Sequence, residues 1–248
     1  MLSVAAGSTK PLLVLFTGTT VPSVKELHGD FDAQFRAAIG DAWQGPWATA
    51  DARDPEASLP AYDSVAGVIV TGSSSSVTDR DREPWMPRLE AWLRGAVAAE
   101  VPVLGVCFGH QILASALGGE VRKNPRGRAI GSRSVRRVGD DPLLKGVPET
   151  FSVNVSHRDH VAVPPPNATT LISADHDDMH AFAAGPWVRA VQFHPEFHDE
   201  IVRGYIAARR EILAGEGLDP DALHRDVVDA PHARRVLRNF VTEFVVKR

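Results

Sequence analysis

Short apolar runs recur along the first half of the chain and have the length of buried β-strands. The runs Leu12–Phe16, 65–70 and 101–106 consist almost entirely of apolar residues, and each is followed by a small or polar residue. Residues 43–51 form a weaker candidate strand, because Pro46 removes a backbone hydrogen-bond donor from it. Strands without polar alternation are typical of a sheet that is covered on both faces.

Segments with helical periodicity separate these runs. Large apolar residues recur at helical spacing through residues 25–39, which predicts one helix that ends at Gly40. The same kind of spacing predicts helices over residues 85–99 and 108–117, and two glycines end the second of them. The alternation of strands and helices predicts an α/β protein whose sheet is at least partly parallel.

The second half of the chain has a different pattern. Residues 120–138 combine many arginines with scattered β-formers, which favours antiparallel strands over strand–helix–strand units. Residues 159–170 contain three consecutive prolines and are predicted to be extended or loop. A further apolar strand is predicted over residues 188–193, and helices over residues 201–215 and 222–246.

The composition is that of a globular protein, and it argues against several classes of partner. Of 248 residues, 44% are hydrophobic and 23% are charged, which leaves enough apolar material for one large core. The net charge of -4 gives no electrostatic reason to expect nucleic acid or an anionic membrane as a partner. No apolar run has the length of a membrane span, and the start of the chain lacks the pattern of a signal peptide. We therefore expect a cytoplasmic protein.

Cys107 is the single cysteine, so it can form neither an intrachain disulfide nor a thiolate metal cluster. It lies in a G-x-C-x-G sequence between a predicted strand and a predicted helix, the arrangement of a nucleophile elbow. Glycines allow the sharp turn, and the positive end of the helix lowers the pKa of a thiol placed there. A buried, unreactive thiol is the alternative, so the motif needs a catalytic partner.

His194 is that candidate partner. It follows the predicted strand 188–193 much as Cys107 follows the strand 101–106. If these strands are parallel neighbours, both side chains emerge at the same edge of the sheet. Glu196 can then orient the imidazole, and Pro195 stiffens the turn between them. Taken alone, His194 would be interpreted as a structural histidine at a strand end, but together the two motifs predict a Cys–His–Glu triad.

The segments GVCFGHQILASALGG and VQFHPE resemble those of class I glutamine amidotransferases, and the resemblance covers about residues 11 to 200. The resemblance implies a flavodoxin-like three-layer α/β/α sandwich with a mixed central sheet. It also implies that the γ-amide of glutamine is hydrolysed through a γ-glutamyl thioester, with release of ammonia. We accordingly expect a flexible lead-in (1–10), a catalytic domain (11–200) and a C-terminal helical extension packed on the same domain (201–248).

The resemblance assigns roles to individual residues. Cys107 corresponds to the nucleophile, His194 to the base and Glu196 to the orienting carboxylate. The main-chain N–H of Phe108 would face the developing oxyanion. Gln111 lies one helical turn after Cys107 and matches a glutamine-binding position, with an exposed polar helix residue as the alternative.

Two further segments match the family less closely. Residues 70–77 correspond to the family's Gly-Gly-Pro loop, which donates the second oxyanion N–H, but Ser73 and Ser74 replace the second glycine and the proline. A backbone N–H does not require a particular side chain, so Ser73 is assigned to the oxyanion hole. Ser156 and His157 resemble the Ser-His-x-Asp segment near the substrate's amino-acid end, where they would bind substrate or hold the loop.

Histidines and carboxylates gather in two places that invite a metal-site interpretation. One is residues 175–180, and the other is the pair His194 and His198. Pro195 argues against a helix that would align the pair, and acidic loops that contain histidine are usually only solvated. We therefore expect neither a metal nor a cofactor.

Three functions remain open. The protein can be a glutaminase subunit that passes ammonia to a separate synthetase chain, because the sequence shows no P-loop and no synthetase segment. It can also be an independent hydrolase of γ-glutamyl compounds, since the Gly-Ser loop and the Ser-His-Arg-Asp segment resemble those of γ-glutamyl peptidases. The third is a non-catalytic or regulatory partner of a synthetase, against which the intact triad counts. The departure at Ser73 and Ser74 favours the independent hydrolase.

Overall fold

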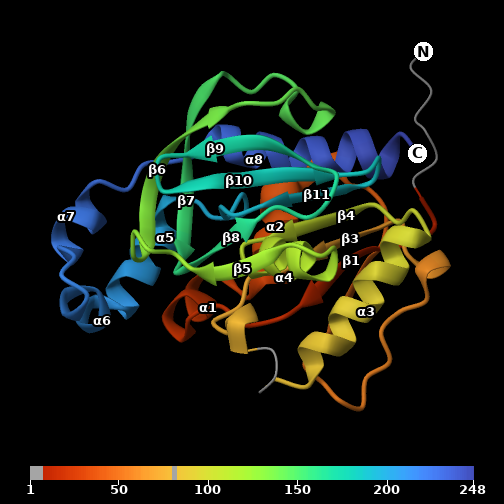
Figure 1. The fold of residues 1–248 in the computed structure, drawn as a ribbon, viewed down its shortest axis with the longest axis horizontal. Helices are drawn as coiled ribbons and strands as arrows, with labels where there is room; N and C mark the ends of the chain where they lie inside the picture. Colours follow the sequence, from red (N-terminus) through yellow and green to blue (C-terminus); the bar gives the residue numbers. More distant parts are fainter. Residues whose placement is uncertain (1–7, 80–82) are drawn as a thin grey trace.

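A mixed sheet of nine strands lies at the centre of the computed structural model, which describes residues 8–79 and 83–248 (Figure 1). The strand order is β2-β1-β3-β4-β11-β10-β9-β6-β7. The first five strands in this order are mutually parallel: β2 (Trp47–Asp51), β1 (Leu12–Phe16), β3 (Gly67–Val70), β4 (Val103–Val106) and β11 (Val188–Val191). The other four pair antiparallel: β10 (Asp177–Ala184), β9 (Ala168–Ala174), β6 (Ala129–Arg137) and β7 (Thr150–His157).

Helices cover both faces of this sheet. Successive residues of β1 point to opposite faces, so Leu12 joins one hydrophobic cluster and Leu13 the other. Burial of such a side chain contributes about 1.5–3 kcal/mol to stability relative to leaving it exposed. The Leu12 cluster includes side chains of α1 (Pro22–His28), α2 (Phe31–Ile39), α5 (Asp199–Ala208) and α8 (Pro231–Asn239). The Leu13 cluster includes side chains of α3 (Trp85–Ala98) and α4 (Phe108–Ala116), which lie in front of the sheet in Figure 1. The predicted three-layer α/β/α sandwich is confirmed.

The C-terminal residues pack against the same face as α2. After α8 the chain continues as a π-helical segment, Phe240–Val246, whose Phe240 and Phe244 are buried in the Leu12 cluster. A Cβ atom on Gly67 of β3 would lie 2.8 Å from the Val245 side chain, so the segment packs directly on the sheet. None of the helices in the described residues is long and apolar enough to cross a membrane.

The single helix predicted over residues 25–39 is wrong. The structure has two helices, α1 and α2, separated at Gly29, whose φ of 75° ends the first. Asp30 then caps the second helix by accepting a hydrogen bond from the Phe31 N–H at 2.9 Å. Leu27, one of the apolar residues whose spacing predicts that helix, is 77% exposed. Glycine favours the end of a helix and aspartate favours the N-cap of the next, and these two preferences outweigh the apolar spacing.

The two predicted C-terminal helices are also divided. The segment 201–215 contains most of α5 and all of α6 (Arg210–Gly215), with Arg209 between them. The segment 222–246 begins inside α7 (Pro220–Arg225), whose N-terminus Asp219 caps, and then passes through a loop before α8. Pro231 begins α8, because proline lacks the N–H that an internal helical position needs.

The strands predicted in the middle of the chain are present, but two different sheets contain them. Residues 120–138 form β5 (Glu120–Lys123) and β6, and β5 pairs with β8 (Asp159–Val163) in a separate two-stranded sheet. The remainder of segment 159–170 is loop leading into β9, in agreement with the prediction. Short 3-10 turns occur at Gly40–Ala42, Tyr62–Ser64, Val77–Asp79 and Pro142–Leu144. Of the predicted lead-in, residues 1–7 lie outside the described residues.

Candidate functional site

The site lies where β4 and β11 end side by side. The two strands are parallel neighbours, with Val106 opposite Val191, as the triad prediction requires. Cys107 comes directly after β4, and its N–H donates to the Val191 carbonyl at 2.9 Å. His194 follows β11 and donates its N–H to the Asn154 carbonyl at 2.9 Å. The two segments that carry the predicted triad are therefore anchored at one edge of the sheet.

Cys107 occupies a sharp turn between β4 and α4. Its φ of 54° and ψ of -102° lie outside the regions that residues with a Cβ normally adopt, at a cost of about 1–3 kcal/mol. The turn also needs close backbone approach on both sides. A Cβ on Gly105 would lie 2.4 Å from the Gly109 oxygen, and one on Gly109 would lie 2.3 Å from the Val70 oxygen. The G-x-C-x-G sequence is thus the one that this turn can accommodate.

The imidazole of His194 is held by its neighbours. Its Nδ1 lies 2.7 Å from Oε1 of Glu196, and both side chains are buried. The Phe197 ring is parallel to the imidazole, with the ring centroids 4.0 Å apart. Burial acts to lower the pKa of His194, but the negative charge of Glu196 and the neighbouring Cys107 outweigh it and raise the pKa to about 10. The geometry therefore favours a charged imidazolium beside the cysteine.

The loop after β3 closes over this pair. A Cβ placed on Gly72 would lie 2.9 Å from Cε1 of His194 and 3.7 Å from the Cβ of Cys107. The absence of a side chain at Gly72 is what lets the loop approach so closely. Ser73 follows in the same loop, and its Oγ accepts a hydrogen bond from the Ser75 N–H at 3.1 Å.

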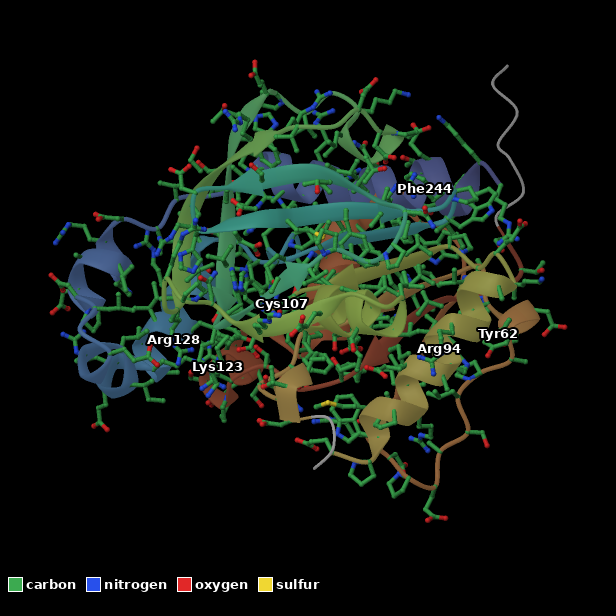
Figure 2. All side chains as sticks on the ribbon, in the orientation of Figure 1. Tyr62, Arg94, Cys107, Lys123, Arg128 and Phe244 are labelled. Carbon is green, nitrogen blue, oxygen red and sulfur yellow. The ribbon has the colours of Figure 1, made fainter. Side chains whose placement is uncertain are left out.

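A cavity of about 230 Å³ opens above Cys107. Figure 2 shows Cys107 near the middle of the molecule and Arg128 toward α6. The cavity brings together the five sequence-predicted residues other than the triad: Ser73, Phe108, Gln111, Ser156 and His157. The two segments marked in the sequence also contribute Ser74, Ser75, Arg158 and Asp159 to the lining. The sequence motifs did not mark three further lining residues, Arg128, Arg209 and Ile212.

Gln111 is buried, so its interpretation as an exposed helix residue is wrong. Its Nε2 donates to the Asp159 carbonyl and to Oε1 of Gln192, at 3.0 Å in each case. Ser156 faces the cysteine through its main chain, since its carbonyl oxygen lies 3.9 Å from the Cys107 Sγ. These contacts place both residues at the wall of the cavity.

His157 is buried with its Nδ1 3.0 Å from the Asp159 carbonyl oxygen. Its ring lies near those of His176 and His180, with centroids 5.8 and 6.0 Å away. Burial lowers the pKa of His157 to about 3, so its imidazole is neutral at ordinary pH. His157 therefore lines the cavity as a buried, neutral side chain.

Arg209 is the main cavity residue that sequence reasoning missed. It lies at the break between α5 and α6, where its guanidinium donates to the Ser156 Oγ at 2.6 Å and stacks over the Tyr205 ring at 4.8 Å. Arg128 is already paired with Glu216 at 2.7 Å. No local motif marks Arg209, because its position depends on where α5 ends and how α5 packs beside β7.

The expectation that residues 175–180 form a solvated loop is wrong for Asp177 and His180. Each of these two side chains is only 1% exposed. Both belong to β10, which begins at Asp177 and pairs with β9 and β11 inside the main sheet. Asp175 in the turn before β10 and Asp178 in the strand are exposed, whereas Asp177 and His180 point inward.

Known sequences and structures resemble this chain. The family model described as glutamine amidotransferase class-I matches residues 47–206. The glutamine-hydrolyzing GMP synthase of Pyrobaculum aerophilum is 33% identical over 177 residues, which are 70% of this chain and 33% of that protein. Gamma-glutamyl peptidase 3 of Arabidopsis thaliana is 29% identical over 190 residues, which are 72% of this chain and 74% of that protein. The chain thus spans about a third or less of the GMP synthases that it matches.

Solved structures agree with the family match. A glutamine amidotransferase from Methylobacillus flagellatus superposes with a TM-score of 0.75 at 26% identity, covering 97% of this chain and 95% of that chain. A glutamine amidotransferase from Thermotoga maritima shares the fold with a TM-score of 0.76 at 21% identity, covering 96% and 99%. The family model extends over more than half of the chain and includes the segments that end at Cys107 and His194. The chain therefore belongs to the class I glutamine amidotransferase family.

Proposed function

We propose that the protein hydrolyses the γ-glutamyl amide bond of glutamine or of a γ-glutamyl compound through a thioester on Cys107. The observation that carries the proposal is the cysteine in a positive-φ turn beside an imidazole whose Nδ1 lies 2.7 Å from Glu196. A thiolate is the reactive form of cysteine, and a neighbouring imidazolium stabilises it. The raised pKa of His194 agrees with such an ion pair.

The proposed reaction has two steps. The Cys107 thiolate attacks the γ-carbonyl carbon, and the resulting oxyanion accepts hydrogen bonds from the main-chain N–H groups of Phe108 and Ser73. His194 gives its proton to the leaving nitrogen, the C–N bond breaks, and ammonia or an amine departs. His194 then takes a proton from water, whose oxygen attacks the thioester and releases glutamate and Cys107.

The local backbone conformation supports the main-chain N–H groups of Phe108 and Ser73 as the oxyanion donors. The Phe108 N–H is at the first position of α4, where a helical N–H lacks an intrahelical acceptor. The loop that contains Ser73 lies against Gly18, where a Cβ would be 2.7 Å from the Ser73 Cα. Serine in place of glycine is compatible with the role because the N–H, and not the side chain, would act.

The glutamyl group would be recognised by the cavity wall that Gln111, Ser156 and Arg209 line. Gln111 and Ser156 present polar groups to it, and Arg209 places a guanidinium there through its bond to the Ser156 Oγ. A fixed guanidinium suits a carboxylate, because it can form two parallel hydrogen bonds with one. We assign the α-carboxylate to Arg209, and to His157 the role of holding the loop that carries Ser156.

We favour an independent γ-glutamyl hydrolase over a synthetase subunit. The match to γ-glutamyl peptidase 3 spans 72% of this chain and 74% of that protein, and Ser73 and Ser74 depart from the family's Gly-Gly-Pro loop. Delivery of ammonia to a separate synthetase is the second candidate, supported by the identity to the GMP synthases. The arrangement of Cys107, His194 and Glu196 speaks against a purely regulatory role.

The test is turnover of glutamine and of a panel of γ-glutamyl dipeptides by the purified protein. Cys107→Ala should abolish release of ammonia or amine, and mass spectrometry of the wild type should detect a γ-glutamyl adduct on Cys107. Gly215→Ala is the matched control, because nothing lies within 4 Å of a Cβ added there. Wild-type turnover in Cys107→Ala would contradict the proposed nucleophile. Turnover of the dipeptides without glutamine hydrolysis would favour the independent hydrolase.

A further inference from the structure

Three buried side chains behind the cavity wall converge on one point. His157 ends β7, while Asp177 and His180 belong to β10, and the exposed fractions are 4%, 1% and 1%. One nitrogen or oxygen atom from each lies within 4.8 Å of the others. Among the described residues, His157 Nε2, Asp177 Oδ2 and both ring nitrogens of His180 are buried without a hydrogen-bond partner.

The remaining polar atoms of His157 and Asp177 are oriented by the main chain. His157 Nδ1 faces the Asp159 carbonyl oxygen at 3.0 Å, so the proton belongs on Nδ1 and the lone pair on Nε2. Asp177 Oδ1 accepts from the Met179 N–H at 3.1 Å, which leaves Oδ2 pointing into the cluster. A histidine that donates one ring N–H to a carbonyl and offers the other nitrogen is the usual form of a metal ligand.

The spacing within the cluster suits a shared cation better than direct hydrogen bonds. His180 Nδ1 and Asp177 Oδ2 are 3.7 Å apart, beyond the range of about 2.7–3.2 Å for an N–H···O bond. Two ligands of a tetrahedral zinc ion lie about 3.3 Å apart, given metal–ligand distances of about 2.0–2.1 Å. Small side-chain rotations therefore close the set around an ion, whereas buried polar atoms left alone are unfavourable.

We propose that His157, Asp177 and His180 form a structural Zn²⁺ site, with water or the adjacent His176 in the fourth position. Two imidazoles and one carboxylate are ligands that zinc accepts, and the ion's charge offsets the burial of Asp177.

The site would stabilise the cavity wall and take no part in the chemistry. His157 is adjacent to Ser156, whose carbonyl oxygen faces the Cys107 Sγ at 3.9 Å. The Asp159 carbonyl, which His157 contacts, also accepts from Gln111. An ion that fixes His157 therefore fixes two segments of the proposed substrate site.

The experiment measures metal in the full chain without an affinity tag. The background is Cys107→Ala, which removes the cysteine as a competing zinc ligand and makes the result independent of the proposed hydrolysis. We expect about one equivalent of Zn²⁺ by mass spectrometry after gel filtration. Asp177→Asn and His180→Gln should each lose it, and His224→Gln should retain it, because His224 is exposed on α7.

A second measurement avoids dependence on variants that fail to fold. Zn²⁺ added to the chelator-treated Cys107→Ala protein, at about a hundred times its Kd, should raise the Tm by roughly 5–10 °C. Co²⁺ in its place should give the visible absorption of a tetrahedral site. The proposal is overturned if no metal is retained and Zn²⁺ leaves the Tm unchanged, or if Asp177→Asn and His180→Gln bind as much Zn²⁺ as His224→Gln.

Discussion

Gly72→Ala tests the close packing of the β3 loop on the proposed catalytic pair. The added methyl group would lie 2.9 Å from Cε1 of His194, which is about 0.6 Å inside the shortest ordinary carbon–carbon contact. The imidazole cannot move away from the added methyl group without losing its hydrogen bond to Glu196 and its stacking on Phe197. Gly72 has no positive φ, so alanine imposes no backbone strain of its own. The substitution should therefore displace His194 relative to Cys107 while the protein stays folded.

A displacement of this size should reduce kcat by about 10–100-fold, equivalent to about 1.4–2.7 kcal/mol in the activation barrier. The assay compares turnover of the γ-glutamyl substrate and, independently of any substrate, the rate at which iodoacetamide alkylates Cys107 at neutral pH. Gly215→Ala should match the wild type in both, since its Cβ meets open space. Turnover and alkylation within twofold of wild type in Gly72→Ala would refute the reasoning.

Three further substitutions test the rest of the site. Glu196→Gln should lower the pKa of His194 from about 10 toward its ordinary value of 6.5, measured by NMR titration of the imidazole, and should lower kcat by about 10²–10⁴-fold. The pairing of charged His194 with Glu196 stabilises the fold fully below about pH 6.5, and this stabilisation is lost as the pH rises through about 10. In Glu196→Gln, urea unfolding should show the loss of stability at lower pH. An unchanged titration of His194 would contradict the role of Glu196 in raising its pKa. Gly109→Ala should lower the free energy of unfolding by about 2–3 kcal/mol, because the new Cβ meets the main-chain oxygen of β3 at 2.3 Å, and wild-type stability in thermal unfolding would show that the turn relaxes. Arg209→Met should raise KM about tenfold or more with little change in kcat. The control Arg210→Met should leave KM unchanged, because Arg210 is exposed and paired with Asp221. Equal effects of the two substitutions would contradict the assignment of the substrate α-carboxylate to Arg209.

The sequence by itself determined the elements on which the site is built. The apolar runs that became β1, β3 and β4 are buried on both faces of the sheet, and no other local structure accommodates them as well. The glycines around Cys107 marked the turn because their spacing reflects a steric requirement within a few residues. His194 and Glu196 were recognisable for the same reason, since their contact spans only two residues of chain.

The tertiary structure alone decided which distant residues meet. The adjacency of β4 and β11 depends on strand order, which apolar periodicity does not encode. Arg209 reaches Ser156 only because α5 ends where it does, and the burial of Asp177 with His157 and His180 depends on how β7, β9 and β10 are arranged. Local sequence fixes backbone conformation and burial within an element, whereas contacts across many residues depend on the free energy of packing the whole chain.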